Sequence, residues 1–292
     1  KDYYANYLKN VAAVTIEDVK AMAEKYIKPA NAYILIVGDR AVAENVAKYS
    51  AGEEVDFYDT YGNDYVEALK PVAEGVTAQT VLDKAILAKY GMPKGKALDK
   101  KLGKIKDITV KMNASVQGQS ISVTRYQKAP NKFAMVMAMG TMVVQKQTFN
   151  GTEAKVSGMQ GNKTLEGDEL EEMKLSSVMF DDVKDTKHTF NLLGIEPVDG
   201  KDAYKMEKVS PTGNKETEWY DVASGLPVKA MQVKESEEMG GSMVITSTFS
   251  EYKEVDGIKF AHKIGQSFGP QALDMEVLSV EFNTKIGDDV FE

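Results

Sequence analysis

The chain has 292 residues, enough for one large domain or two ordinary ones, with room for a substantial core. Its net charge of -8 and pI near 5.1 argue against binding to nucleic acid, which needs clustered Lys and Arg. It contains no cysteine, which excludes disulfides, thiolate metal ligands and a cysteine nucleophile. No segment reaches the roughly 18 apolar residues of a membrane-spanning helix, and the first residues do not form a signal peptide.

The first 50 residues are predicted to form a small α/β fragment. Residues 3–13 have a helical pattern, and Thr15 followed by Asp18 is typical of a capping box that begins a second helix. The apolar run Tyr33–Val37 predicts a short buried strand, and residues 40–49 return to a helical pattern. This fragment is too small to fold alone, and the chain opens inside a helical pattern. We therefore expect it to be a piece of a longer protein.

Residues 51–75 lose this periodicity and predict a linker, because they are rich in Gly, Tyr and acidic residues. A helix is expected to begin near Thr77 and to end at Gly91, with an apolar side made of Val81, Ile86, Leu87 and Tyr90. A second short helix is predicted at 97–102.

From Ile108 to Val116 the apolar residues occupy every even position, which predicts a strand with one dry and one wet face. The same pattern recurs to the C-terminus, with turn dipeptides such as Asp199-Gly200 and Asp256-Gly257. Alternation stops between residues 168 and 193, where one or two helices are expected between the halves of the sheet. About eleven antiparallel strands are too many for a flat sheet, so the sheet should curl. Beyond the first strand we expect extended segments from about 121 to 126 and at about 132–139, 141–149, 152–157, 203–209, 215–222, 227–235, 242–252, 258–266 and 273–282.

The last strand changes phase. Leu273, Met275 and Val277 are apolar at odd positions, whereas Leu278 and Val280 are apolar at even ones. A shift by one residue is what a β-bulge produces, because it turns the following side chains to the other face. We therefore predict a bulge or sharp bend near Val277-Leu278.

The sequence offers little for catalysis. His188 and His262 are the only histidines and lie far apart, so a helical two-histidine zinc motif is excluded. Asp181 and Asp185 could share a helix face with His188, but a solvated charged face explains them more simply. No phosphate loop or dinucleotide fingerprint is present. We expect no catalytic residues, no metal site and no cofactor in this chain.

The positive feature is apolar. Phe133, Met135, Met137 and Met139 fill the odd positions of one strand, while small or branched apolar residues fill the even ones. Such a strand should be dry on both faces, one meeting helices and the other an enclosed interior. Methionine suits adaptable apolar surfaces, although plain core packing is the default explanation. These four residues are the candidate lining of a cavity that binds a hydrophobic ligand.

Part of the N-terminal fragment resembles the closing segment of a repeat of the insulinase-type (M16) zinc peptidases. The resemblance covers about residues 1–50 and rests on Val14–Val19, Lys25–Asn31 and Ile34–Asp39. In that family the zinc ligands form an inverted His-x-x-Glu-His motif, which is absent here. The resemblance therefore implies no metal or catalytic role for this chain.

Residues 76–291 resemble the LolA-like lipoprotein carrier superfamily, mostly in their turns. That resemblance implies an unclosed antiparallel β-barrel covered by helices, with an apolar cavity that can hold acyl chains in the periplasm. The segments that carry it are Val81–Lys84, Lys128–Lys132, Phe149–Gly151, Val198–Tyr204, Trp219–Asp221, Ser224–Pro227 and Tyr252–Phe260.

The sequence thus predicts an α+β chain of the bacterial periplasm or cell envelope. A peptidase-like fragment at 1–50 and a linker at 51–75 should precede a LolA-like half-barrel domain at 76–292. The leading hypothesis is non-catalytic binding of a lipid, acyl chain, lipoprotein or other hydrophobic ligand or peptide. The first alternative is an accessory region that positions substrate or partner for an M16-type peptidase upstream or in a partner. The second alternative is a purely structural envelope module.

Overall fold

The computed structural model describes most of the chain as two compact units, Lys1–Ala68 and Leu69–Glu292. Several predictions fall outside its described residues, among them Asp185, most of the predicted linker and parts of the segment at 40–49. The described residues are 3–28, 33–38, 43–49, 55–58, 62, 68–116, 119–159, 161–184, 187–236, 241–268 and 271–292.

The described part of the N-terminal unit contains three helices, α1 (Tyr3–Ala12), α2 (Ile16–Tyr26) and α3 (Ala43–Ala47). The predicted capping box of α2 is confirmed. The Asp18 amide donates to Thr15 Oγ1 at 3.1 Å, and the Thr15 amide donates to Asp18 Oδ2 at 3.0 Å. These two bonds satisfy amide donors that the first turn of a helix cannot pair internally.

The predicted strand at Tyr33–Val37 is wrong. The segment has no regular secondary structure, and all five of its side chains are exposed. A strand forms only where a neighbouring strand pairs with its amide and carbonyl groups. Among the described residues of this unit no strand is present to do so.

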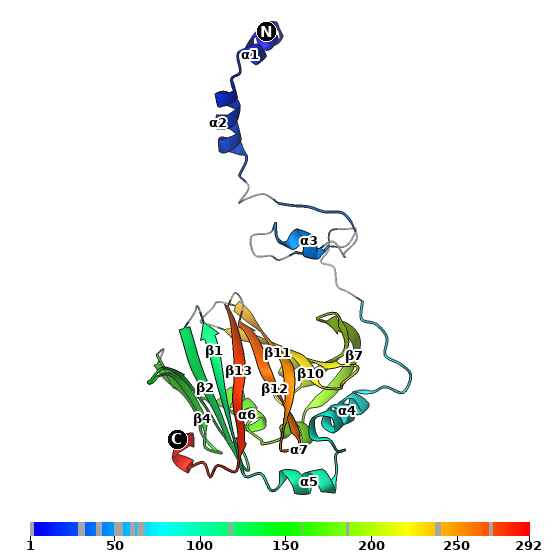
Figure 1. Cartoon of the computed structure of the whole chain (residues 1–292), viewed down its shortest axis with the longest axis vertical. Helices are drawn as coiled ribbons and strands as arrows, with labels where there is room; N and C mark the ends of the chain where they lie inside the picture. The colour runs from blue at the N-terminus through cyan, green and yellow to red at the C-terminus, as the bar shows by residue number, and fades with distance from the viewer. Residues whose placement is uncertain are drawn as a thin grey trace. The chain divides into compact units, whose positions relative to one another are not determined.

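The C-terminal unit is built on one antiparallel sheet of thirteen strands (Figure 1). The spatial order is β6-β5-β4-β3-β2-β1-β13-β12-β11-β10-β9-β8-β7, so β6 and β7 are the two edges and the sheet does not close. The strands are β1 (Asp107–Val116), β2 (Gln119–Lys128), β3 (Lys132–Met139), β4 (Met142–Phe149), β5 (Ala154–Gly158), β6 (Gly161–Thr164), β7 (Thr189–Val198), β8 (Lys201–Val209), β9 (Lys215–Asp221), β10 (Pro227–Ser236), β11 (Gly241–Val255), β12 (Ile258–Phe268) and β13 (Gln271–Phe282).

Eleven of these strands are predicted from the sequence, and the two edge strands are not. Strand β6 has the polar sequence Gly-Asn-Lys-Thr, and all four residues are exposed, so it lacks an apolar period. Strand β7 contains Gly194 and Pro197, which interrupt the strand pattern. Proline is tolerated there because β7 is an edge strand that pairs along one side with β8 and, on its other side, with Lys70 alone.

Four helices accompany the sheet: α4 (Ala78–Tyr90), α5 (Lys96–Leu102), α6 (Gly167–Ser176) and α7 (Asp181–Lys184). The last two confirm the helices expected between the halves of the sheet. Thr77 caps α4, and Gly91 ends it in the left-handed conformation at φ 69°. The predicted apolar side of α4 is buried at Val81, Ile86 and Tyr90, but Leu87 is half exposed, so that part of the prediction is wrong.

Figure 1 shows the sheet bending around α4, α6 and α7, and we call the side toward these helices the inner face. The largest core cluster lies there. Tyr90 of α4, Leu98 of α5 and Val183 of α7 pack against Met112 of β1 and Val277 of β13. The inner face therefore carries both the helices and the main apolar core.

The predicted bulge in the last strand is confirmed. Lys111 of β1 lies opposite Ser279, while its neighbour Met112 lies opposite Val277, so Leu278 is the extra residue. Its side chain is exposed, whereas Val277 and Val280 are both buried. The bulge keeps apolar side chains on the inner face before and after the phase change, and it increases the local twist.

The start of β1 is tied to the C-terminal segment by Asp107. Its buried carboxylate accepts hydrogen bonds from the Thr284 amide at 2.6 Å, the Thr284 hydroxyl at 3.0 Å and the Lys285 amide at 3.1 Å. Three donors to one ionised group fix the path of the chain beyond β13.

We expect Asp107→Ala to lower the free energy of unfolding by roughly 2–4 kcal/mol, because three charge-assisted hydrogen bonds are lost at a buried position. Urea unfolding measures the change. The matched control is Asp274→Ala, an exposed aspartate of β13, which should stay within about 0.5 kcal/mol of the parent. Equal effects of the two substitutions would contradict this role for Asp107.

Candidate functional site

The inner face is the candidate site, and strand register defines which residues reach it. Met135 of β3 lies opposite Arg125 of β2, which lies opposite Val110 of β1. Neighbouring residues in register share a face, so the odd positions of β3 join the side of the main core. Met135 and Met137 are both partly buried against that core.

The four predicted ligand-lining residues do not share one environment. Phe133 packs beside Phe149 in a small cluster at β4, β5 and α6, whereas Met135 and Met137 border the main core. Met139 is half-buried at the end of β3. All four side chains keep some exposure, which distinguishes them from the fully buried Met206 of β8.

Both faces of β3 are covered, as the sequence predicts, but not in the predicted manner. Helices and core lie together on the inner side. The outer side at Ala134 is covered by the C-terminal 3-10 helix η3 (Asp288–Phe291), through contacts with Ile286 and Phe291. A strand that is apolar on both faces therefore reports here on a covering C-terminal segment.

A continuous row of apolar side chains crosses five strands of the inner face. In register order it consists of Phe249 of β11, Ile264 of β12, Met275 of β13, Ala114 of β1 and Ile121 of β2. We call these residues the inner apolar row. Ala114 is buried, but the other four are only partly buried, so the row presents apolar surface that the helices do not cover.

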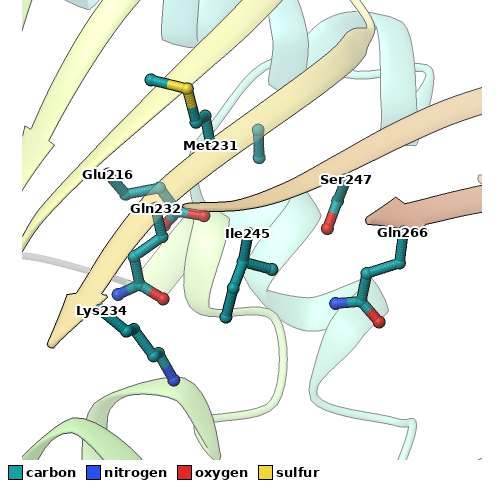
Figure 2. Close-up of a pocket in the computed structure, with 8 residues that line it drawn as sticks. Glu216, Met231, Gln232, Lys234, Ile245, Ser247 and Gln266 are labelled. Atoms are coloured by element: carbon teal, nitrogen blue, oxygen red, sulfur yellow. The ribbon is translucent and has the colours of Figure 1, made fainter. Parts of the chain in front are cut away.

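Beside this row a cavity of about 220 Å³ opens between β9, β10, β11 and β12 (Figure 2). Figure 2 shows Gln232, Ile245 and Ser247 projecting to one side of their strands and Met231 to the other. Among the residues that the structure describes, the side chains of Gln232, Ser247 and Gln266 have no hydrogen-bond partner. The lining residues are Glu216, Ala230, Met231, Gln232, Lys234, Ile245, Ser247 and Gln266.

The polar cavity and the inner apolar row adjoin each other. Ser247 and Gln266 are paired across β11 and β12, two positions along from the pair Phe249 and Ile264. The spacing of two keeps all four on the same face. The inner face thus offers apolar area and unsatisfied hydrogen-bonding groups side by side.

A charged cluster lies on the same face at β8 and β9. Lys208 Nζ is 3.5 Å from Glu216 and 3.4 Å from Glu218, and Glu218 also accepts a hydrogen bond from the Tyr220 hydroxyl. Burial alone would lower the pKa of Lys208, but the two carboxylates outweigh it and raise that pKa above its ordinary value. Lys208 is therefore a satisfied cation.

A second polar contact joins two helices. The Tyr90 hydroxyl donates to Asp182, with a shortest oxygen–oxygen distance of 2.7 Å, and Lys89 forms an ion pair with the same carboxylate at 2.7 Å. Burial, helped by Asp182, raises the pKa of Tyr90 far above its ordinary value. This arrangement anchors α7 to α4 and supplies no nucleophile.

Sequence reasoning missed the polar members of this face and misjudged Asp181. Arg125 follows Ile121 and Val123 in the same alternation, and that signal places it on the dry face. Asp181 lies near Arg125 and Lys208 on this side of the sheet, and burial raises its pKa, so it is more than part of a solvated charged surface. Among the described residues no group of His, Asp or Glu is placed to hold a metal ion.

No family model matches this sequence, and no curated protein sequence matches it. Two solved structures are similar in fold. One is a DUF1329 family protein from Desulfovibrio piger ATCC 29098, 15% identical, with a TM-score of 0.48 over 74% of this chain and 97% of that one. The other is a LolA superfamily protein from Nitrosomonas europaea, 16% identical, with a TM-score of 0.47 over 75% of this chain and 98% of that one.

Identities and TM-scores this low carry no information about what the chain binds. The architecture itself is clear: an α+β unit whose unclosed antiparallel sheet holds helices on its inner face. None of the described helices is long and apolar enough to cross a membrane.

The charged cluster predicts a pH dependence. Burial and the neighbouring Glu218 raise the pKa of Glu216 above 4.5, so the folded chain holds this proton at pH values where an unfolded glutamate is ionised. A raised carboxyl pKa weakens folding as the pH rises through that interval. Glu216→Gln removes the effect.

We therefore expect the Glu216→Gln variant to gain stability relative to the parent as the pH rises from about 4 to about 7. Urea unfolding of both proteins at several pH values measures the difference. A difference that stays constant or shrinks with rising pH would contradict the assigned shift.

Proposed function

We propose that the C-terminal unit binds a lipid, an acyl chain or another hydrophobic ligand on its inner face, without catalysing a reaction. The observation that supports this most is the inner apolar row. Four of its five side chains stay partly exposed although they lie on the helix-covered side of the sheet. Exposed apolar surface that adjoins a core is typical of binding sites.

The size of the row suits an elongated ligand. Five strands about 4.8 Å apart span about 19 Å, long enough for much of an acyl chain. Each methylene that leaves water contributes about 0.8 kcal/mol, so a chain along this row gains several kcal/mol before the entropic cost of ordering it. The thioethers of Met137 and Met275 border this surface and can repack around ligands of different shape.

In this proposal Phe133, Met135, Met137 and Met139 contribute unequally. Met137 and Met139 lie toward the end of β3 that is near Ile121, since the neighbouring pair Ser122 and Ala138 is in register. They are the members best placed to contact the ligand. Phe133 and Met135 lie deeper, against the small cluster at β5 and the main core.

The place of action that we propose is the bacterial periplasm or cell envelope, with a lipoprotein or a free lipid as cargo. The support is the set of turn motifs shared with LolA-like carriers. Asp199-Gly200 and Asp256-Gly257 form the two-residue turns between β7 and β8 and between β11 and β12, with positive φ at both residues of each pair.

One observation favours the second candidate, an accessory role beside an M16-type peptidase. In the N-terminal unit Leu8, Ile16 and Tyr26 are exposed, as is the whole apolar run Tyr33–Val37. Apolar surface of this extent is typical of an element that packs against another protein body. In this alternative, residues 1–50 dock on a peptidase-like domain and the sheet positions a substrate or partner.

The main proposal predicts a separation of stability from binding. Met137→Ala should weaken binding of a fluorescent fatty acid several-fold while costing less stability than truncation of a fully buried methionine. Met206→Ala is the matched control, because Met206 is fully buried on the same sheet. It should cost roughly 2–5 kcal/mol and leave the affinity for the probe unchanged.

Urea unfolding and probe titration on the same samples measure both quantities. Absence of probe binding by the parent, together with equal stability losses in the two variants, would favour a purely structural module.

A further inference from the structure

Arg125 stands in the middle of the inner face. It is directly opposite Val110 on one side and Met135 on the other, and all its nearest partners in register are apolar. The chain has only two arginines, Arg40 and Arg125, against 34 lysines among its basic residues. A guanidinium is thus placed on the one face of the sheet where a charge is costly to desolvate.

This guanidinium has no counter-ion. Arg125 forms no hydrogen bond or ion pair with any other residue that the structure describes, and Asp181, although close enough to affect its titration, is not paired with it. Its one close contact is the Phe133 ring, 5.4 Å from the guanidinium carbon. The side chain itself is exposed, so it borders space that a ligand can enter.

Other cations on this side of the chain are already satisfied. Lys208 contacts two carboxylates, Lys89 is paired with Asp182, and Lys101 donates to the carbonyl of Gly257 at 2.7 Å. Arg125 is different from these, because its five N–H donors point into an apolar surface with no acceptor in reach.

A guanidinium in such a place suits one kind of ligand group. Its planar fork matches the two oxygens of a carboxylate or phosphate, and it is less strongly hydrated than an ammonium group, so it can act beside apolar surface. The face of Phe133 holds the fork in one orientation and lowers the entropic cost of pairing.

We propose that Arg125 binds the oxyanion head, carboxylate or phosphate, of an amphiphile whose apolar tail lies along the inner apolar row. The inference rests on the proposed function and adds a ligand class to it: anionic amphiphiles, in preference to neutral lipids of the same length.

Two probes with the same tail and fluorophore test this directly: 11-(dansylamino)undecanoic acid and its methyl ester. Titrated into the full chain, the acid should bind about tenfold more tightly than the ester, the range expected for a charge-assisted pair. Arg125→Gln should reduce the affinity for the acid to that for the ester and leave the ester unaffected. Arg125→Lys should keep part of the preference, because it retains charge but not the fork.

The matched control is Lys111→Gln, which removes a cation from the outer face of β1, where Lys111 pairs with Glu281. It should not change either affinity. Thermal unfolding of each variant confirms that the fold is intact, and Arg125→Lys remains informative if Arg125→Gln does not fold.

The outcomes separate the two proposals. If the parent binds neither probe, the proposed function is wrong. If it binds acid and ester equally, or if Arg125→Gln weakens both alike, binding stands and the role of Arg125 is wrong. A lysophospholipid with a phosphate head should displace the acid, whereas inorganic phosphate at the same concentration should not. Displacement by inorganic phosphate would show a free-anion site and contradict an amphiphile.

Discussion

Burial of apolar side chains on one face of a single sheet organises the whole C-terminal unit. Thirteen strands present more inner surface than four short helices can cover. Tyr90, Leu98 and Val183 close the part near β1 and β13, and they leave the inner apolar row partly exposed. The same imbalance between a wide sheet and short helices creates both the stable core and the candidate binding surface.

Polar groups on this face divide by whether the chain satisfies them. Lys208, Tyr90 and Asp182 are paired inside the protein and hold elements together. Arg125 and Gln266 lack partners among the described residues, and both border open space. A folded chain rarely leaves a guanidinium without an acceptor beside its core, so unsatisfied groups are better indicators of a ligand than the apolar residues around them.

Much of this fold follows from side-chain periodicity and turn chemistry. Alternation from Ile108 to Val116 predicts the central strand, and the phase change at Val277-Leu278 predicts the bulge, because both are local patterns. The edge strands β6 and β7 escape prediction because pairing with a neighbour, and not their own pattern, makes them strands. The converse holds at Tyr33–Val37, an apolar run without a partner strand among the described residues of its unit.

The candidate site is only partly predictable for the same reason. The odd positions of β3 identify an inward apolar strand, but only the register with β2 shows that Arg125 and Met135 are neighbours. The polar cavity depends on β9 to β12 lying in order, which a linear pattern cannot specify. The apolar face was therefore accessible from sequence and its polar partners were not.

The central claim is that hydrophobic ligands bind to the inner face, and the 15 methionines allow a direct measurement. Methyl NMR of the protein labelled at the methionine methyl groups, titrated with a long-chain fatty acid, should shift the signals of Met137, Met139 and Met275. The signals of the buried Met206 and of the exposed Met22 in α2 should stay in place. Shifts confined to the N-terminal unit, or no shifts at all at saturating ligand, would contradict the account.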